Sequence, residues 1–202
     1  MRKFSTAFPA LLLLCAGCST TPPRKPEEKA PPEPVTGLHA LAQMFSSARL
    51  WAADVQILRL TSLHVGDLKP QPGKATAWQA TFVAPSLGQS RVYTFSAVDI
   101  STSIRQGTFP DAPVPFSARG QSAQPFPIAA ARKDTDEVYQ TALQHAKDYD
   151  GKHPGMIINY LLELNNRSPD ALWRVIWGES ASTSAFSVLV DASTGAFVGV
   201  LH

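Results

Sequence analysis

The sequence predicts an α+β protein made of two tandem repeats, each a helix packed on an antiparallel β-sheet. Three observations lead to this fold class. Two segments, 37–53 and 134–150, repeat apolar residues at helical spacing. Each is followed by runs of apolar and β-branched residues, punctuated by turn-forming residues, as strands are. The same order of elements occurs in both halves of the 202-residue chain, which favours a duplication.

The first half begins with a helix expected from about Gly37 to Ala53, because its apolar residues fall on one face. These residues are Leu38, Leu41, Phe45, Ala48 and Ala52. Strands are expected at Val55–Val65, Ala75–Val83 and Arg91–Asp99. A Pro-Ser-Leu-Gly sequence at 85–88 predicts the turn between the last two of them. No last strand is predicted after Ser103.

The middle segment, residues 104–132, interrupts the pattern. It holds five prolines and two glycines, which punctuate any regular element, but also the large apolar residues Phe109, Phe116, Phe126 and Ile128. Structureless loops of this length are uncommon and are either functional or linkers. Two interpretations follow: a linker packed against the body, or a loop that takes part in binding.

The second half repeats the order. A helix is expected at Asp134–Asp150, with acidic residues in its first turn and a buried stripe on one face. The stripe consists of Val138, Ala142, Ala146 and Tyr149. Strands are expected at Met156–Leu164, Leu172–Gly178, Ala185–Asp191 and Ala196–Leu201.

The repeat can be followed residue by residue. Val98-Asp99-Ile100-Ser101-Thr102-Ser103 matches Val190-Asp191-Ala192-Ser193-Thr194-Gly195, and Trp78 and Trp173 each open the strand before the hairpin. The predicted organisation is therefore a first repeat at 36–103, a Pro/Phe-rich linker at 104–132 and a second repeat at 133–202.

The amino-terminal residues have the order of a secretory signal peptide. Arg2 and Lys3 precede an apolar run that is too short to span a bilayer, and small residues follow it. Leu14-Cys15-Ala16-Gly17-Cys18 resembles the lipobox of bacterial lipoproteins, apart from cysteine where the family usually has leucine. The resemblance implies removal of residues 1–17, lipidation of Cys18 and a bacterial envelope location. Ser19 resembles the outer-membrane sorting pattern, and implies the periplasmic face of that membrane.

Residues 18–35 are expected to form an extended tether. The segment is rich in proline and in charges of both signs, and it has too little apolar surface to fold. Polyproline II geometry, at about 3.1 Å per residue, would let it span roughly 50 Å. A passive spacer is one interpretation, and a polyproline ligand for a partner's groove is the other.

Charge and residue types exclude several functions. The chain has 18 basic and 16 acidic residues, and the leader removes Arg2 and Lys3, so the mature chain is formally neutral. We therefore expect no nucleic-acid binding. No cysteine remains after Cys18, so disulfides and thiolate chemistry are not expected. The sequence has no histidine metal motif, nucleophile elbow or phosphate loop. We expect no enzyme activity, no cofactor and no metal.

The sequence from Ser187 to Leu201, SVLVDASTGAFVGVL, resembles the carboxyl-terminal half of PepSY domains. The family pattern of valine-aspartate, small residues and Thr-Gly falls on Val190, Asp191, Thr194 and Gly195. The resemblance covers about residues 134–202 and implies a helix across an antiparallel sheet. Members occur in protease propeptides and as envelope proteins, so it implies inhibition or modulation of a protein partner.

The candidate residues divide into turn formers and binding residues. Asp99, Asp191, Thr194 and Gly195 are expected to form Asp-turns, in which the carboxylate accepts backbone N–H bonds. Trp78 and Trp173 fit the core or a half-buried sheet position better than a ligand-stacking surface, and Trp177 shares a face with Trp173 at period two. Five aromatic residues are nevertheless candidates for binding a partner, because aromatic side chains are enriched at protein interfaces. They are Phe109, Phe116, Phe126, Trp173 and Trp177.

The expected function is a non-catalytic protein-binding or inhibitory module, held at the membrane by lipid and acting on an envelope protein. One alternative is a structural component of an envelope assembly. A second is a small-ligand-binding domain of the cystatin-like kind, with polar groups such as Asp99 and His64 meeting in an apolar pocket.

Overall fold

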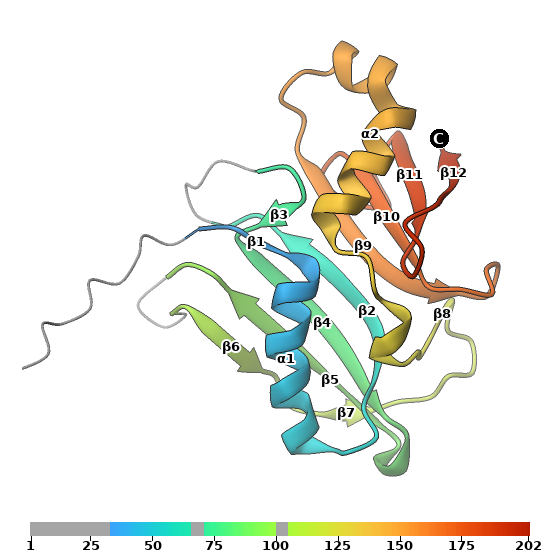
Figure 1. Cartoon of the computed structure of the whole chain (residues 1–202). Coiled ribbons are helices and arrows are strands. Elements are labelled where there is room, and N and C mark those ends of the chain that lie inside the picture. Colours follow the sequence, from blue (N-terminus) through green and yellow to red (C-terminus); the bar gives the residue numbers. More distant parts are fainter. Residues whose placement is uncertain (1–32, 66–70, 100–104) are drawn as a thin grey trace, which may run out of the picture. The chain divides into compact units, whose positions relative to one another are not determined.

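The computed structural model describes residues 33–65, 71–99 and 105–202, which lie in one compact unit. Cys18, the leader and most of the tether fall outside the described residues. The unit is α+β, with two long helices and a large antiparallel sheet, which confirms the predicted class (Figure 1).

The elements follow the predicted order closely. In the first half they are β1 (Val35–Thr36), α1 (Gly37–Trp51), β2 (Gln56–Leu63), β3 (Lys74–Ala75), β4 (Ala77–Ala84) and β5 (Gln89–Ser96). In the second half they are α2 (Thr135–Lys152), β9 (Ile158–Asn165), β10 (Leu172–Trp177), β11 (Phe186–Asp191) and β12 (Phe197–Leu201). β1 already begins at the last residue of the predicted tether.

The segment 104–132 contains more regular structure than its prolines suggest. It forms β6 (Gly107–Pro110), β7 (Val114–Pro115), β8 (Ala123–Gln124) and a short 3-10 helix (Ile128–Ala130). β6 pairs with β5, so the expectation that no last strand follows Ser103 is wrong. β7 also pairs with β5, and β8 pairs with β9. The segment is thus attached to the sheet of both halves.

Strands from the two halves join in one sheet. Its order is β12-β11-β10-β9-β2-β4-β5-β6, and every pair is antiparallel. The join is made by β2 and β9, where Leu60 lies opposite Leu162. Both helices lie across the same face of this sheet (Figure 1). β12 and β6 are the outer strands of the order.

The core lies between the helices and the sheet. The predicted stripe of α2 is buried at Val138, Ala142 and Ala146, and Tyr149 packs against the core's edge. The indole rings of Trp78 and Trp173 meet edge to face near the centre, with ring centroids 6.4 Å apart. Aromatic pairs in this geometry stabilise by more than their buried area alone.

The first turns of α1 and α2 meet at the side chain of Asp134. This residue is the N-cap of α2 and accepts the amide of Thr135 at 2.7 Å. The same carboxylate accepts the amide of Leu38 in α1 at 2.9 Å and the hydroxyl of Thr36 at 2.7 Å. One negative charge therefore serves the amino ends of two helices, where free N–H groups and the helix dipoles favour it.

Buried polar groups complete this junction. Thr135 is fully buried, accepts the amide of Gly37 at 2.9 Å and donates its hydroxyl to the carbonyl of Gly73. The amide of Gly73 donates to the hydroxyl of Tyr160 at 2.8 Å. Burial raises the pKa of the Tyr160 phenol, which favours its neutral form in this junction. Each half thus supplies hydrogen-bond partners that the other half needs.

Candidate functional site

The outer strand β12 presents exposed apolar side chains. Phe197, Val198 and Leu201 have exposed fractions of 40%, 49% and 41%. The strand, Phe-Val-Gly-Val-Leu, contains no charge and no proline. Its inner side pairs with β11, with a bulge between Leu189 and Val190, and its outer side ends the sheet. Such a strand offers unpaired backbone groups to another chain.

The opposite edge of the sheet is protected. β6 has four residues, begins at Gly107 and ends at Pro110, which has no N–H to offer. Proline and short length are the usual means by which proteins prevent pairing at a sheet edge. β12 has no proline and no charged residue; its protections are its length of five residues and the bulge in its pairing with β11.

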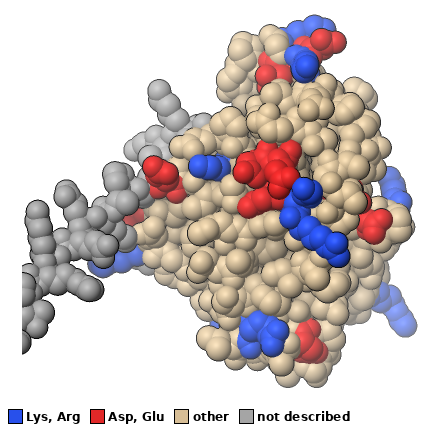
Figure 2. Space-filling view, viewed as in Figure 1, with Lys and Arg blue, Asp and Glu red and all other residues tan. Residues whose placement is uncertain are grey.

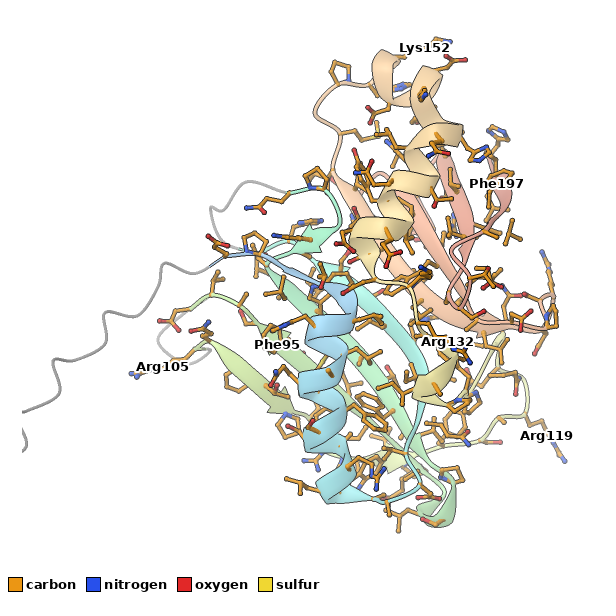
Figure 3. The ribbon with its side chains drawn as sticks, viewed as in Figure 1. Phe95, Arg105, Arg119, Arg132, Lys152 and Phe197 are labelled. Atoms are coloured by element: carbon orange, nitrogen blue, oxygen red, sulfur yellow. The ribbon has the colours of Figure 1, made fainter. Side chains whose placement is uncertain are left out.

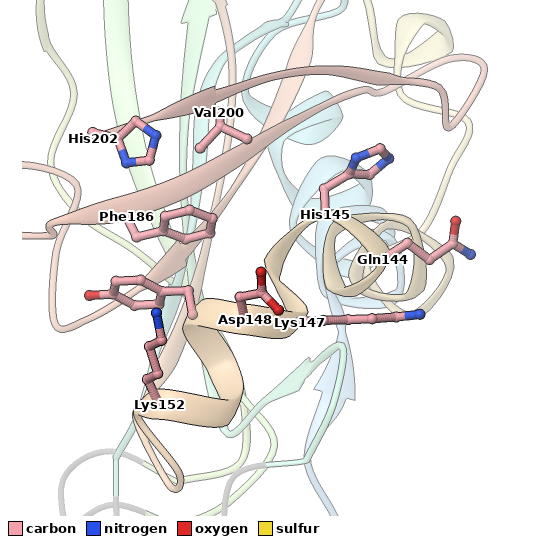
Figure 4. A pocket seen from close by; sticks show the side chains of 9 residues that line it. Gln144, His145, Lys147, Asp148, Lys152, Phe186, Val200 and His202 are labelled. Carbon is pink, nitrogen blue, oxygen red and sulfur yellow. The ribbon is translucent and has the colours of Figure 1, made fainter.

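A groove of about 550 Å³ lies beside β12, on the face of the sheet that carries the helices (Figure 4). α2 forms one wall, and the end of the sheet forms the other. The wall from α2 consists of Gln144, His145, Lys147, Asp148, Tyr149 and Lys152. The wall from the sheet consists of Phe186, Val200 and His202. Figure 3 shows Lys152 at the end of α2 and Phe197 on β12, both in this part of the molecule.

Stacked rings line the groove and its border. His145 stacks on Phe197 with ring centroids 3.6 Å apart and planes 10° from parallel. Tyr149 stacks on Phe186 at 4.4 Å and on His153 at 4.2 Å. These contacts fix the flank of α2 against the last two strands, so both walls of the groove are held in place.

Charged residues are interspersed over the face seen in Figure 2, with an acidic group at the start of α2. Lys133 and Glu137 form an ion pair of 2.8 Å there. The groove lies at the other end of α2, and its charged residues differ from those at the start of the helix. Lys147 and Lys152 are its formal cations and Asp148 is its acid. In the parts of the chain that the structure describes, neither lysine forms an ion pair.

Three of the five aromatic binding candidates, Trp173, Trp177 and Phe126, are buried, which corrects their selection as residues that bind a partner and, for Trp173, agrees with the core alternative. Trp173 and Trp177 do share a face, as their period predicts, but that face packs under α2. Their indole N–H groups donate to the carbonyl of Lys133 at 2.9 Å and to the carboxylate of Asp150 at 2.9 Å. Phe126 bridges to Ile57 and is buried in the core.

The other two candidates are half-buried. Phe109 lies in β6 opposite Thr94. The amide of Phe116 donates to the carbonyl of Gly88 at 2.9 Å, which attaches the segment after β7 to the β4–β5 turn. The structure does not bring the five candidates together in one surface.

The Asp-turn before β12 is built around Asp191. One carboxylate oxygen accepts the backbone and side-chain groups of Ser193 and Thr194, at 2.7 to 2.9 Å. Partial burial alone would raise the pKa of Asp191, but these hydrogen bonds outweigh it and lower the pKa. Gly195 has φ +77°, which a side chain would disfavour. The turn therefore fixes where β12 begins.

In the first half, the carboxylate of Asp99 accepts the amide of Gln106 at 2.7 Å. The rest of its predicted turn lies outside the described residues. His64 contacts the carbonyl of Ile158 at 2.9 Å. Asp99 and His64 therefore have separate hydrogen-bond partners.

A second hollow, of about 330 Å³, lies between α2 and the start of β9. It is lined by Gln71, Pro72, Tyr139, Gly155, Met156, Ile158 and Tyr160. Burial raises the pKa of Tyr139, with a further contribution from the charge of Asp150. No group of three or more side chains suited to a metal ion occurs among the described residues. Within the same residues, no helix has the length and apolar character needed to cross a membrane.

Comparison with known proteins identifies no family for this chain. No protein-family model matches the chain, and no curated protein matches it. A solved structure described as a "putative lipoprotein" from Clostridium difficile 630 has a TM-score of 0.43 and 8% sequence identity, over 80% of this chain and 91% of the other.

β12 and its groove are not among the candidate sites predicted from the sequence. The residues concerned are aliphatic or are scattered over α2 and the last two strands, so no motif joins them. The available signal was the last predicted strand itself, which is the only predicted strand of the second half without a charged or amide side chain.

Proposed function

We propose that this protein is a lipid-anchored envelope protein whose folded part binds another envelope protein without catalysing a reaction. Cys18 carries the lipid, residues 1–17 are removed, and the body faces the periplasm from the outer membrane. The partner contributes an extended segment, which adds to the sheet as a further strand beside β12.

The anchor is supported by the leader sequence. Its basic start, short apolar run and small residues before Cys18 match what cleavage and lipidation require. Two or more acyl chains would hold the protein stably, where one would not. Labelling cells with a fatty-acid analogue tests this point, because Cys18→Ser should abolish both the label and membrane retention.

We also propose that the two halves are tandem copies, the second of them PepSY-like. In the main sheet order, four antiparallel strands follow each helix: β2, β4, β5 and β6 after α1, and β9 to β12 after α2. The indoles of Trp78 and Trp173 donate to the carbonyls of Val35 and Lys133, at 3.0 and 2.9 Å. Both carbonyls lie two residues before the first residue of a helix, Gly37 or Thr135. The two tryptophans, which align in the repeat, therefore donate to carbonyl groups at equivalent positions before the two helices.

The observation that carries the proposed binding mode is the outer edge of β12, which contains no proline and no charged side chain. A chain added there would satisfy the outer backbone groups and bury Phe197, Val198 and Leu201. Main-chain hydrogen bonds supply affinity in this mode, and pockets for alternate side chains supply specificity. The groove under the same edge provides such a pocket.

The experiment is site-specific photocrosslinking in cells of the full chain. A photoreactive residue replaces Leu201 in β12, or, as a control, Leu87 in the β4–β5 turn; their exposed fractions are 41% and 49%. We expect a discrete crosslinked partner from position 201 and not from position 87. Val198→Lys should abolish it, because an edge lysine opposes strand pairing. Val114→Lys, at a similar exposure of 53% in β7, should leave it unchanged.

No crosslink from position 201, or an identical product from both positions, would refute the proposed site. A partner that survives Val198→Lys would refute strand addition but leave binding. In that case a structural role in an envelope assembly becomes the better hypothesis.

A small-ligand function is the second candidate, supported by the hollow at Tyr139, Met156 and Tyr160. Its volume, about 330 Å³, and its apolar and tyrosine lining fall within the range of ligand pockets. A screen of small apolar compounds by thermal shift tests it. Stabilisation that is lost in Met156→Lys would support this function, and its absence would count against it.

A further inference from the structure

We infer that the segment added to β12 carries acidic side chains at alternate positions, on the face turned toward α2, with apolar side chains between them. This inference rests on the proposed strand addition and deepens it. It concerns the chemistry of the partner segment.

The groove lies where alternate side chains of an added strand would fall. Val200 pairs with Val188 and Val188 with Val175, a core residue under α2, so Val200 faces the helix. Val200 also lines the groove. Side chains on the same face of the next strand, about 4.8 Å outward, would lie along the flank of α2.

The flank of α2 offers positive charge to those side chains. Lys147 and Lys152 are exposed and have no ion pair within the described ranges. Asp148 is the acid in the lining, and Asp150 already accepts the indole of Trp177. Figure 4 shows Lys147 and Lys152 on α2 with their ammonium ends pointing in different directions and Asp148 between them. A carboxylate in the added strand would therefore meet one lysine, and a lysine there would be repelled.

The other residues that line the groove also favour a carboxylate ligand. His145 and His202 present ring nitrogens that can donate to a carboxylate. The rings of Tyr149 and Phe186 offer apolar surface to the methylene groups of aspartate or glutamate. The groove therefore fits a short acidic side chain with an apolar stem.

β12 itself has no charged side chain on its other face, and Arg174 of β10, which lies on that face, donates to the hydroxyl of Ser187 at 3.0 Å. Leu201 pairs with Ser187, one residue out of phase with Val200, so Leu201 and Gly199 face away from α2. Side chains of the added strand on that face would lie beside a leucine and a glycine. Apolar residues are therefore expected at the positions between the acidic ones.

The test measures binding of three synthetic ten-residue peptides by fluorescence anisotropy. Each alternates valine with glutamate, lysine or threonine. The protein is the mature chain with Cys18→Ser, so that lipid does not contribute. We expect the glutamate peptide to bind at least about five-fold more tightly than the lysine peptide at low salt, and the difference to shrink in 1 M salt. Val198→Pro should remove the binding of all three, because an edge proline opposes strand pairing whatever the charge of the added strand.

Charge reversal in the groove supplies the second arm. Lys147→Glu with Lys152→Glu should invert the preference, so that the lysine peptide binds more tightly. The matched control is Arg119→Glu with Arg167→Glu, which changes the net charge equally. Arg119 lies in the loop before β8, and Arg167 in the β9–β10 turn, at the opposite end of the strands from Phe186 (Figure 3). The control should keep the original preference.

Equal binding of the three peptides, or an effect of the control as large as that of the groove variant, would overturn the inference and leave strand addition standing. A crosslinked partner segment without acidic residues would overturn it in the same way. Failure of every peptide to bind would also overturn it, and failure of the crosslink at position 201 would remove the proposed function as well.

Discussion

Asp134, a partly buried carboxylate, should be costly to remove, because it serves the amino ends of two helices at once. Replacing it with alanine removes the N-cap of α2, which costs about 1 kcal/mol. The change also leaves the amide of Leu38 and the hydroxyl of Thr36 without their partner, at about 1 kcal/mol more for groups that are only partly buried. Loss of a charge from two helix dipoles adds about 0.5 kcal/mol. The expected loss in free energy of unfolding is about 2–3 kcal/mol.

The assay is urea unfolding followed by tryptophan fluorescence, with thermal unfolding beside it. The folded unit of about 170 residues should show a Tm lower by about 4–12 °C for Asp134→Ala. Asp134→Asn should cost less than about 1 kcal/mol, because asparagine is an equally good N-cap.

The matched control is Asp136→Ala. Asp136 lies in the same first turn, and its side chain accepts the amide of Glu137. Its removal deletes the same charge near α2 without touching α1, and should cost about 0.3–1 kcal/mol. If Asp134→Ala were no more destabilising than Asp136→Ala, the idea that one carboxylate joins the two helices would be wrong.

Three further predictions concern the junction and the turn. Gly37→Ala should destabilise by about 1–3 kcal/mol in urea unfolding, because a Cβ would lie 2.8 Å from the Trp173 ring; wild-type stability would refute the close packing. Tyr160→Phe should cost about 1–3 kcal/mol, since it orphans the buried amide of Gly73, and unchanged hydrogen exchange of that amide would contradict this. Asp191→Ala should cost about 1 kcal/mol at pH 7. Because the folded pKa of Asp191 is lowered, its contribution is present above the unfolded value of about 3.9 and is lost as the pH falls through the folded pKa, so variant and wild type should converge in acid unfolding.

The helices and the inner strands could be predicted because their signals are local. Val138, Ala142 and Ala146 repeat at helical spacing, and all three are buried in the structure. The predicted ends of α2 differ from the observed ones by one or two residues. A helix stripe and a turn formed around Asp191 each depend on residues within a few positions of one another, so a single sequence contains the information.

The joined sheet could not be predicted in the same way. The pairing of β2 with β9 brings together Leu60 and Leu162, about a hundred residues apart, and nothing in either strand names its neighbour. Proline hid the strands of the middle segment: Pro110 ends β6 and Pro115 ends β7, and both oppose a prediction of strand. Their positions at the end of short outer strands are where the sheet tolerates proline.

The burial of Trp173 and Trp177 shows a different limit. Alternation places both residues on one face of β10, and the structure agrees. Which face of β10 is covered depends on where α2 packs. The alternation of residues along the strand is the same whichever face is buried. Two aromatic residues on one face of a strand are therefore compatible with a core or with a surface. In the structure their indole N–H groups donate to Lys133 and Asp150, which is consistent with a place in the core.

The contrast between the two outer strands bears on function. If the halves are copies, as proposed, β6 and β12 occupy equivalent places, and the bonds of Trp78 and Trp173 show how alike the centres of the two halves are. The outer strands differ: β6 ends in proline, while β12 exposes three large apolar residues beside a groove with two lysines. Folding does not require this difference, because the first half has the same architecture and its outer strand β6 ends in proline. An edge that is protected on one side and left open on the other is what a protein needs when it takes an added strand at one end of its sheet only.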